Sequence, residues 1–125
     1  MERKPGGYRT PDLAARVLSV ISEENHRQWF QQIWNGLTGA STKRHPAPYP
    51  QELAERLIRM FSFVGDTVLD PFSGTGTTSV AAALWGRNSV GYEIDESYLS
   101  MGVNRFRKDT SGLFSNSQLT VNGLK

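Results

Sequence analysis

The stretch "TVLDPFSGTGTTSVAAALWGRNSVGYEI", residues 67–94, decides the fold. Residues 67–70 form an apolar segment that ends at an acid, and they predict a short buried strand. After the glycine-threonine turn, residues 77–85 predict a helix that Gly86 ends, and 88–94 predict a second strand. Strand, helix and strand in this order indicate parallel strands joined by a crossover.

Helices are predicted on both sides of this stretch. Apolar residues recur at helical spacing after Thr10, which can cap a helix, after Ser22 and after Pro50. On the other side, Asp95 is placed to cap a further helix, and residues 118–121 could add a short third strand. The predicted fold class is therefore α/β, with two to three parallel strands and flanking helices, preceded by a helical segment.

Length and composition limit the classes of protein that fit. The 125 residues suffice for about one domain with a buried core, and no apolar run approaches the roughly 18 residues of a membrane span. Because no apolar stretch follows the basic residues at the N-terminus, we predict no signal peptide, no membrane association and a cytoplasmic location. The absence of cysteine excludes disulfides and thiolate metal sites.

The net charge of +2 is too small to indicate nucleic-acid binding, but basic residues gather in the first half of the chain. Residues 1–60 carry nine Lys and Arg against six Asp and Glu (+3), while residues 61–125 carry five against six (−1). The first half could face phosphates, although an ordinary solvated surface explains the same charge more simply.

The turn between the first strand and its helix has the residues of a ligand site. In parallel sheets ligands lie beyond the carboxyl ends of the strands, where Asp70 stands. Gly74 and Gly76 let the backbone approach a ligand closely. Thr77 and Thr78 begin the helix, where hydroxyls and unpaired N–H groups meet an anionic group.

Three kinds of ligand could use such a turn. A Walker phosphate loop requires a lysine that is absent here, and a dinucleotide fingerprint requires a third glycine where Ser79 stands. A nucleoside without a pyrophosphate needs fewer glycines and more polar groups. Glu93, 23 residues after Asp70, is spaced to accept hydrogen bonds from ribose hydroxyls, although a surface acid at a strand end would look the same. Together these residues suit an adenosine that carries an amino-acid tail.

These residues also carry a resemblance to a known family. "DPFSGTGTT" (70–78) resembles the S-adenosylmethionine motif of the DNA amino-methyltransferases, which modify adenine N6 or cytosine N4 in DNA, as in restriction–modification systems. "KRHPAPYPQELAERLIRMFS" (43–62) is similar to the segment that precedes this motif in permuted members, and "GYEIDESYLSMGVNRF" (91–106) to the ribose-binding strand and its helix. "KPGGYR" (4–9) resembles the connecting and target-recognition part. The fold that this implies is a partial Rossmann-like methyltransferase fold.

The resemblance implies a cofactor site for S-adenosylmethionine. Its residues are Ala47, Pro48, Tyr49, Asp70, Pro71, Phe72, Gly74, Gly76, Thr77, Thr78 and Glu93. By the family's pattern, Phe72 would pack on the cofactor, the threonines would anchor its methionine part, and Glu93 would take the ribose. Residues 47–49 would lie over the methionine end, partly through backbone groups.

Some of these residues also have a simpler structural explanation. Phe72 could fill the junction between strand and helix, and Tyr49 could pack where a helix begins. Asp95 fits a helix cap better than a second ligand group, and His45 fits a loop hydrogen bond better than a catalytic base.

The sequence lacks the motif that carries catalysis in this family. Members have Asp, Asn or Ser followed by Pro-Pro and an aromatic residue. The polar side chain accepts hydrogen bonds from the target amino group, and the aromatic stacks on a base rotated out of the duplex. No such string occurs in the 125 residues, and "HPAPYP" (45–50) has Ala47 where the polar residue should stand. We therefore assign no catalytic residue and no metal ligand.

The resemblance and the missing motif together set the expected organisation. Residues 1–42 are predicted to be a helical segment at the end of the target-recognition or connecting region, and residues 43–125 to be the cofactor-binding half of a site-specific DNA methyltransferase. An inactive module that keeps the cofactor pocket is the alternative. The expected partners are double-stranded DNA, through the full enzyme, and a catalytic-half polypeptide or a second copy that covers the open sheet edge.

Overall fold

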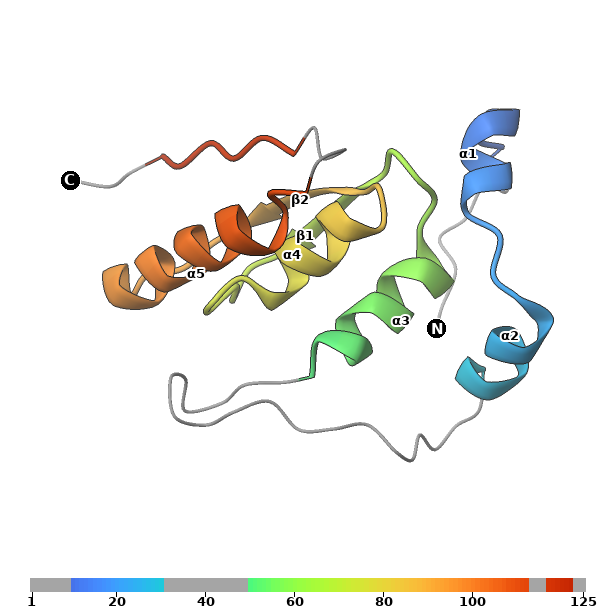
Figure 1. Ribbon diagram of the computed structural model, residues 1–125, viewed down its shortest axis with the longest axis horizontal. Helices are drawn as coiled ribbons and strands as arrows, with labels where there is room; N and C mark the ends of the chain where they lie inside the picture. Colours follow the sequence, from blue (N-terminus) through green and yellow to red (C-terminus); the bar gives the residue numbers. More distant parts are fainter. Residues whose placement is uncertain (1–9, 31–49, 113–116, 123–125) are drawn as a thin grey trace, which may run out of the picture.

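The computed structural model describes residues 10–30, 50–112 and 117–122. The chain folds into helices and a parallel pair of strands, which confirms the predicted α/β class (Figure 1). The elements in chain order are α1 (Leu13–Leu18), α2 (Glu23–Trp29), α3 (Gln51–Phe61), β1 (Thr67–Asp70), α4 (Thr77–Leu84), β2 (Asn88–Gly91) and α5 (Glu96–Asp109). Among the described residues, no helix is long and apolar enough to span a membrane.

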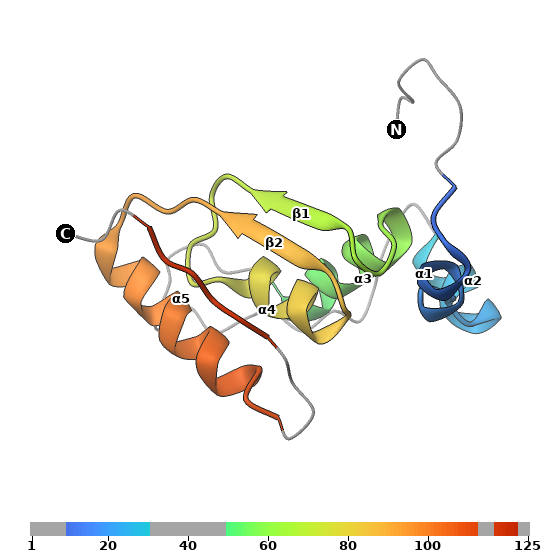
Figure 2. The same cartoon turned by 90° about the horizontal axis from the view of Figure 1, so that it is seen from above.

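The sheet consists of β1 and β2, and their residues pair in parallel from Thr67 with Asn88 to Asp70 with Gly91. This register brings the carboxyl ends of the two strands level with each other. Helices α3 and α4 lie on one face of the sheet (Figure 2). The core forms there, because Val68 packs against a cluster of buried residues from the two helices, Ala54, Ile58, Ala81 and Ala82.

The opposite face of the sheet carries apolar side chains that no described residue buries. Leu69 and Val90 pair across the ladder and are 63% and 44% exposed. Parallel sheets are ordinarily covered on both faces, because crossover connections place helices there. The described part of the chain thus covers one face only.

Buried Arg87 ties the turn before β1 to the turn before β2. Its guanidinium donates to the carbonyl oxygens of Ser62 and Trp85, both at 2.7 Å, and to the Ser62 hydroxyl at 3.0 Å. Burial lowers the pKa of Arg87, and Asp66 opposes this effect by its charge. The side chain therefore satisfies carbonyl groups at the ends of two helices, α3 and α4.

The N-terminal helices differ in part from the sequence prediction. Asp12 caps α1 in place of Thr10, because its carboxylate accepts the Ala15 N–H at 2.7 Å and α1 begins at Leu13. Ser22 caps α2 as predicted. The apolar spacing of α1 predicts a buried stripe, yet α1 buries none of its residues among the described part of the chain.

Helix α2 contacts the rest of the protein through Trp29, which is buried. The Arg59 guanidinium of α3 lies 4.8 Å from the Trp29 ring centroid and 3.8 Å from that of Trp85, so it sits between two indole rings. A second link joins the loop after α1 to Val64, whose N–H donates to the Ser19 hydroxyl at 2.8 Å. These contacts place α1 and α2 beyond α3, away from the sheet (Figure 1).

The second half of the chain follows the prediction closely, with two corrections. Helix α4 ends before Gly86, whose φ is +75°, and Asp95 caps α5. However, β2 ends at Gly91 instead of residue 94, because the chain then turns back toward the loop after β1. Residues 118–121 form no strand: they run as an extended segment beside α5 (Figure 2), outside the hydrogen-bonded ladder.

Candidate functional site

The loops that follow β1 and β2 meet at the carboxyl ends of the strands. The Tyr92 N–H donates to the Asp70 carbonyl oxygen at 3.0 Å, which continues the pairing one residue beyond the ladder. The Tyr92 carbonyl oxygen in turn accepts the Ser73 N–H at 2.9 Å and the Ser73 hydroxyl at 3.2 Å. The glycine-threonine turn is therefore attached to the loop that carries Glu93.

Glu93 lies directly against this turn. Its Oε2 accepts the Gly74 N–H at 2.7 Å, and its Oε1 accepts the Asp95 N–H at 3.1 Å. The carboxylate is thus held by backbone groups on both sides and is not a free surface acid. Because each carboxylate oxygen can accept about two hydrogen bonds, each retains capacity for a ligand hydroxyl.

Asp70, Pro71 and Phe72 form the first part of the turn. Asp70 Oδ1 accepts the Phe72 N–H at 3.1 Å, a local bond that shapes the chain as it leaves the strand. Pro71 is exposed, and the Phe72 ring is 87% exposed. Phe72 therefore does not fill the junction between strand and helix, and its ring is available to a ligand.

The second part of the turn depends on its glycines. Gly74 and Gly76 have φ angles of +53° and +79°, in the left-handed region where a side chain is strained. Gly76 also serves as the N-cap of α4 and so leads directly into Thr77 and Thr78. The first N–H groups of α4 point toward the turn, where a helix start favours negative charge.

Helix α5 supports the turn from behind through Gly102. A Cβ atom at Gly102 would lie 3.2 Å from the Thr75 carbonyl carbon, 3.3 Å from its oxygen and 3.5 Å from the Gly76 nitrogen. Helix and turn are therefore packed backbone to backbone. Gly102 was not among the residues predicted for the site, although a glycine inside a predicted helix is itself a signal of close packing.

Arg105, one helical turn after Gly102, also reaches the site and was missed. Its Nη1 donates to the Thr77 hydroxyl oxygen at 2.8 Å, and its Nη2 donates to Gln51 Oε1 at 3.0 Å. Nothing in its sequence context distinguishes Arg105 from an ordinary solvated helix residue.

Asp95 acts as a helix cap, as the sequence favoured. Its Oδ1 accepts the N–H groups of Ser97 and Tyr98 at 2.9 and 3.1 Å. The Ser97 hydroxyl and then the Tyr98 N–H lower the pKa of Asp95, because they stabilise the charged form. The remaining predicted residues, Ala47, Pro48 and Tyr49, together with His45, lie outside the described residues.

The sequence matches a known protein family. The model of the DNA methylase family that covers N6 and N4 enzymes matches residues 3–104 of the chain. This chain belongs to the DNA methylase family.

Several curated relatives of this DNA methylase chain are type II methyltransferases. It is 48% identical to M.MthZI of Methanothermobacter thermautotrophicus over 92 residues, which are 68% of this chain and 26% of that protein. It is also 48% identical to M.MjaI of Methanocaldococcus jannaschii over 98 residues, which are 75% of this chain and 32% of that protein. The chain thus spans about a quarter to a third of the length of these relatives.

Solved structures agree with the fold of this DNA methylase chain. A putative DNA modification methylase from Thermus thermophilus, TTHA0409, solved with S-adenosyl-L-methionine, superposes with a TM-score of 0.78 at 50% identity. That match covers 89% of this chain and 43% of the solved one. The M1.HpyAVI complex with the same cofactor gives a TM-score of 0.52 at 33% identity, over 58% of this chain and 36% of that one. The partial methyltransferase fold predicted from the sequence is confirmed.

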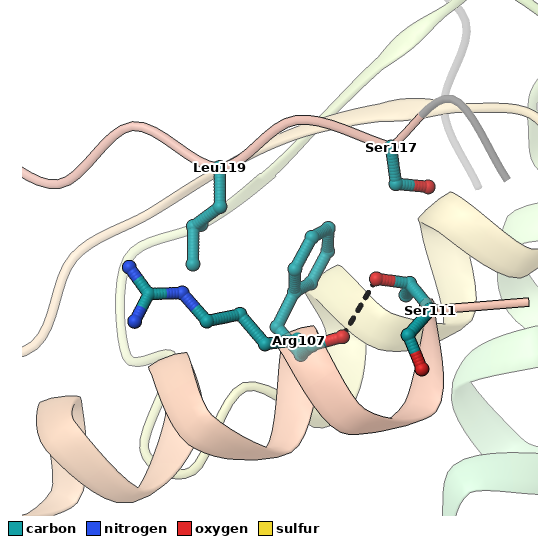
Figure 3. A pocket seen from close by; sticks show the side chains of 6 residues that line it. Arg107, Ser111, Ser117 and Leu119 are labelled. Atoms are coloured by element: carbon teal, nitrogen blue, oxygen red, sulfur yellow. Dashed lines mark hydrogen bonds between the residues drawn. The ribbon is translucent and has the colours of Figure 1, made fainter.

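A separate hollow of about 310 Å³ lies between α5 and the extended segment 117–122 (Figure 3). Arg107 of α5 and Ser111, which follows the helix, face Ser117 and Leu119 across it. None of its lining residues belongs to the predicted cofactor site. No group of metal-ligating side chains occurs among the described residues either.

Proposed function

We propose that this chain binds S-adenosylmethionine and forms the cofactor-binding part of a site-specific DNA methyltransferase that acts on adenine N6 or cytosine N4. The observation that carries the proposal is the contact between Glu93 Oε2 and the Gly74 N–H at 2.7 Å. This contact joins the acid expected at the ribose to the turn expected at the methionine part.

The described residues fit this cofactor at both of its ends. Glu93 has acceptor capacity left for ribose hydroxyls, and Phe72, in the turn that Glu93 contacts, offers an exposed apolar ring. The start of α4 offers N–H groups to a carboxylate. The cofactor contains a nucleoside, an apolar linker and an amino acid, and each of these parts has a matching group at this edge of the sheet.

The chain's own residues would bind and orient the cofactor. S-adenosylmethionine, when bound, supplies an activated methyl group on a sulfonium. Glu93 would fix the ribose, and the α4 start would fix the carboxylate. Holding both ends fixes the direction in which the methyl group points, and the accepting amine must approach along that direction.

The accepting amine would be placed by a polypeptide that carries the [D/N/S]-P-P-[Y/F/W] motif, because this string does not occur in the 125 residues. The exposed face with Leu69 and Val90, together with the unpaired edge of β1 in the described part of the sheet, offers such a polypeptide a place to continue the sheet. We propose this catalytic part as the partner and double-stranded DNA as the substrate of the complete enzyme. A second copy of the chain is the other candidate for that face.

Calorimetry with S-adenosylmethionine tests the cofactor site. We expect the wild-type chain to bind, and both Asp70→Ala and Glu93→Ala to lower the affinity. Glu24→Ala is the matched control, because Glu24 is an exposed acid on α2, away from the turn. Equal affinity in all variants, or tighter binding of NAD or ATP than of S-adenosylmethionine, would refute the proposed site.

A transfer assay tests the enzymatic part. The chain is mixed with a polypeptide that contains a DPPY or SPPY motif, and labelled methyl groups are counted on DNA. We expect incorporation only when both polypeptides are present. The absence of the motif supports a second candidate, a module that binds the cofactor without transferring its methyl group. If the chain binds the cofactor but no methyl group is incorporated with any motif-containing polypeptide encoded near its gene, the binding module is favoured.

A further inference from the structure

Arg105 joins three elements around the proposed cofactor turn. From α5 it donates through Nη1 to the Thr77 hydroxyl oxygen of α4, at 2.8 Å, and through Nη2 to Gln51 Oε1 of α3, at 3.0 Å. Its Nε lies 3.5 Å from Asp109 Oδ2, one turn along α5. The planar guanidinium is therefore held at all its nitrogens, in a geometry that a lysine could not reproduce.

The bond from Arg105 determines how the Thr77 hydroxyl can interact. Thr77 is buried, and its hydroxyl oxygen accepts the Arg105 proton. A hydroxyl has one proton to donate in addition to its lone pairs. Because arginine is a donor only, the proton of the Thr77 hydroxyl must point elsewhere. Thr77 is also the first residue of α4, where an anionic group is favoured.

The second bond of Arg105 reaches the first residue of α3. Gln51 is the first residue of α3, and its Nε2 donates to Glu55 Oε1 at 3.1 Å. This bond turns the amide so that Oε1 faces Arg105. Residues 47–49, predicted from the resemblance to lie over the methionine end, are separated from this helix by Pro50 alone. One side chain thus links the start of α3 to the start of α4.

We propose that Arg105 is a positioning residue of the cofactor site, which orients the Thr77 hydroxyl to donate to the carboxylate of the methionine part and holds the start of α3 beside it. The inference rests on the proposed function. It predicts that Arg105 strengthens the binding of the amino-acid part of the ligand and does not change the binding of its nucleoside part, because the ribose is assigned to Glu93.

The test compares two ligands on the full chain. S-adenosylmethionine has the amino-acid part, and 5′-methylthioadenosine lacks it. For Arg105→Gln we expect roughly tenfold weaker binding of S-adenosylmethionine, the usual order for losing one charge-directed hydrogen bond, and unchanged binding of 5′-methylthioadenosine. Arg107→Gln is the matched control and should leave both affinities unchanged, since Arg107 is an exposed arginine on the same helix.

Variants of Thr77 keep the inference testable if Arg105→Gln fails to fold. Thr77→Val should lower the affinity for S-adenosylmethionine to the same extent and leave the affinity for 5′-methylthioadenosine unchanged. Thr77→Ser keeps the hydroxyl and should bind both ligands like the wild type. The double variant Arg105→Gln/Thr77→Val should lose less affinity than the sum of the two single losses, because part of the effect of Arg105 passes through that hydroxyl.

The outcomes separate the inference from the proposed function. If the wild-type chain binds neither ligand, the proposed function itself fails, and the inference falls with it. If the wild-type chain binds both and Arg105→Gln changes neither affinity, or weakens both equally, Arg105 is at most a structural residue and the inference is overturned.

Discussion

Replacing Gly102 by alanine tests the packing of α5 on the turn, because two effects of known size oppose each other there. Alanine in a helix interior is favoured over glycine by about 1 kcal/mol. The added Cβ, however, would lie 3.2 Å from the Thr75 carbonyl carbon and 3.3 Å from its oxygen. Those distances are shorter than ordinary van der Waals contacts, so either helix or turn must move by a few tenths of an ångström.

The turn has little freedom to move. The neighbours of the added Cβ are backbone atoms, which cannot rotate away as a side chain can. The turn is also fixed by the bonds from Gly76 N–H to the Ser73 carbonyl oxygen, at 2.8 Å, and from Gly74 N–H to Glu93. Overpacking of this kind costs about 1–3 kcal/mol, so we expect a net loss of about 1 kcal/mol in the free energy of unfolding.

Urea unfolding followed by circular dichroism measures this loss, and calorimetry measures the affinity for S-adenosylmethionine, which should fall because the turn shifts. Ser100→Ala is the control, since Ser100 is exposed on the same helix and should gain a few tenths of a kcal/mol from helix propensity alone. If Gly102→Ala instead gains the full propensity of about 1 kcal/mol and binds like the wild type, the proposed support of the turn by α5 is wrong.

Three further predictions concern single residues. Phe72→Ala should leave the free energy of unfolding within about 0.5 kcal/mol of the wild type, because the ring is exposed, while cofactor affinity falls; unchanged affinity by calorimetry would remove Phe72 from the site. Arg87→Met should cost roughly 3 kcal/mol in urea unfolding, because it leaves the Ser62 and Trp85 carbonyl oxygens without their donor; a loss below about 1 kcal/mol would contradict the role of this buried side chain. Because the pKa of Asp95 is lowered in the folded protein, its charge stabilises the fold at any pH above its unfolded pKa near 3.8, and this stabilisation is lost as the pH falls through the folded pKa. Asp95→Asn keeps a capping oxygen but has no charge to lose. Its free energy of unfolding, measured in urea, should therefore fall less than that of the wild type between pH 5 and about pH 3.

The elements around the turn were predictable because their signals are local. The bounds of β1 follow from its apolar run and the acid that ends it, and the end of α4 follows from Gly86. The short run 118–121 has strand-like residues, but a strand also needs a neighbour with free backbone groups at that place, which no local pattern states. Thr10 and Asp12 are both capping residues two positions apart, and only the path of the chain decides between them.

The structure brings several of the predicted site residues together at the sheet edge where the sequence placed them. Asp70, Glu93 and the glycines could be placed at one sheet edge, since parallel strands end together. The bond from Gly74 to Glu93 and the two bonds of Arg105 join residues 19, 28 and 54 positions apart. Such contacts depend on how the helices pack, and the charge of Arg105 alone gives no sign of them.

The sandwich of Arg59 between Trp29 and Trp85 has an optical consequence. Two of the three tryptophans face the same cation, so their fluorescence should report how α2 sits on α3. Trp85 follows the last residue of α4, and the cofactor turn precedes the first, so the length of that helix, about 12 Å, separates them. The emission should therefore change when the N-terminal helices detach and stay nearly constant during a cofactor titration. Tryptophan fluorescence thus reports the docking of these helices separately from cofactor binding.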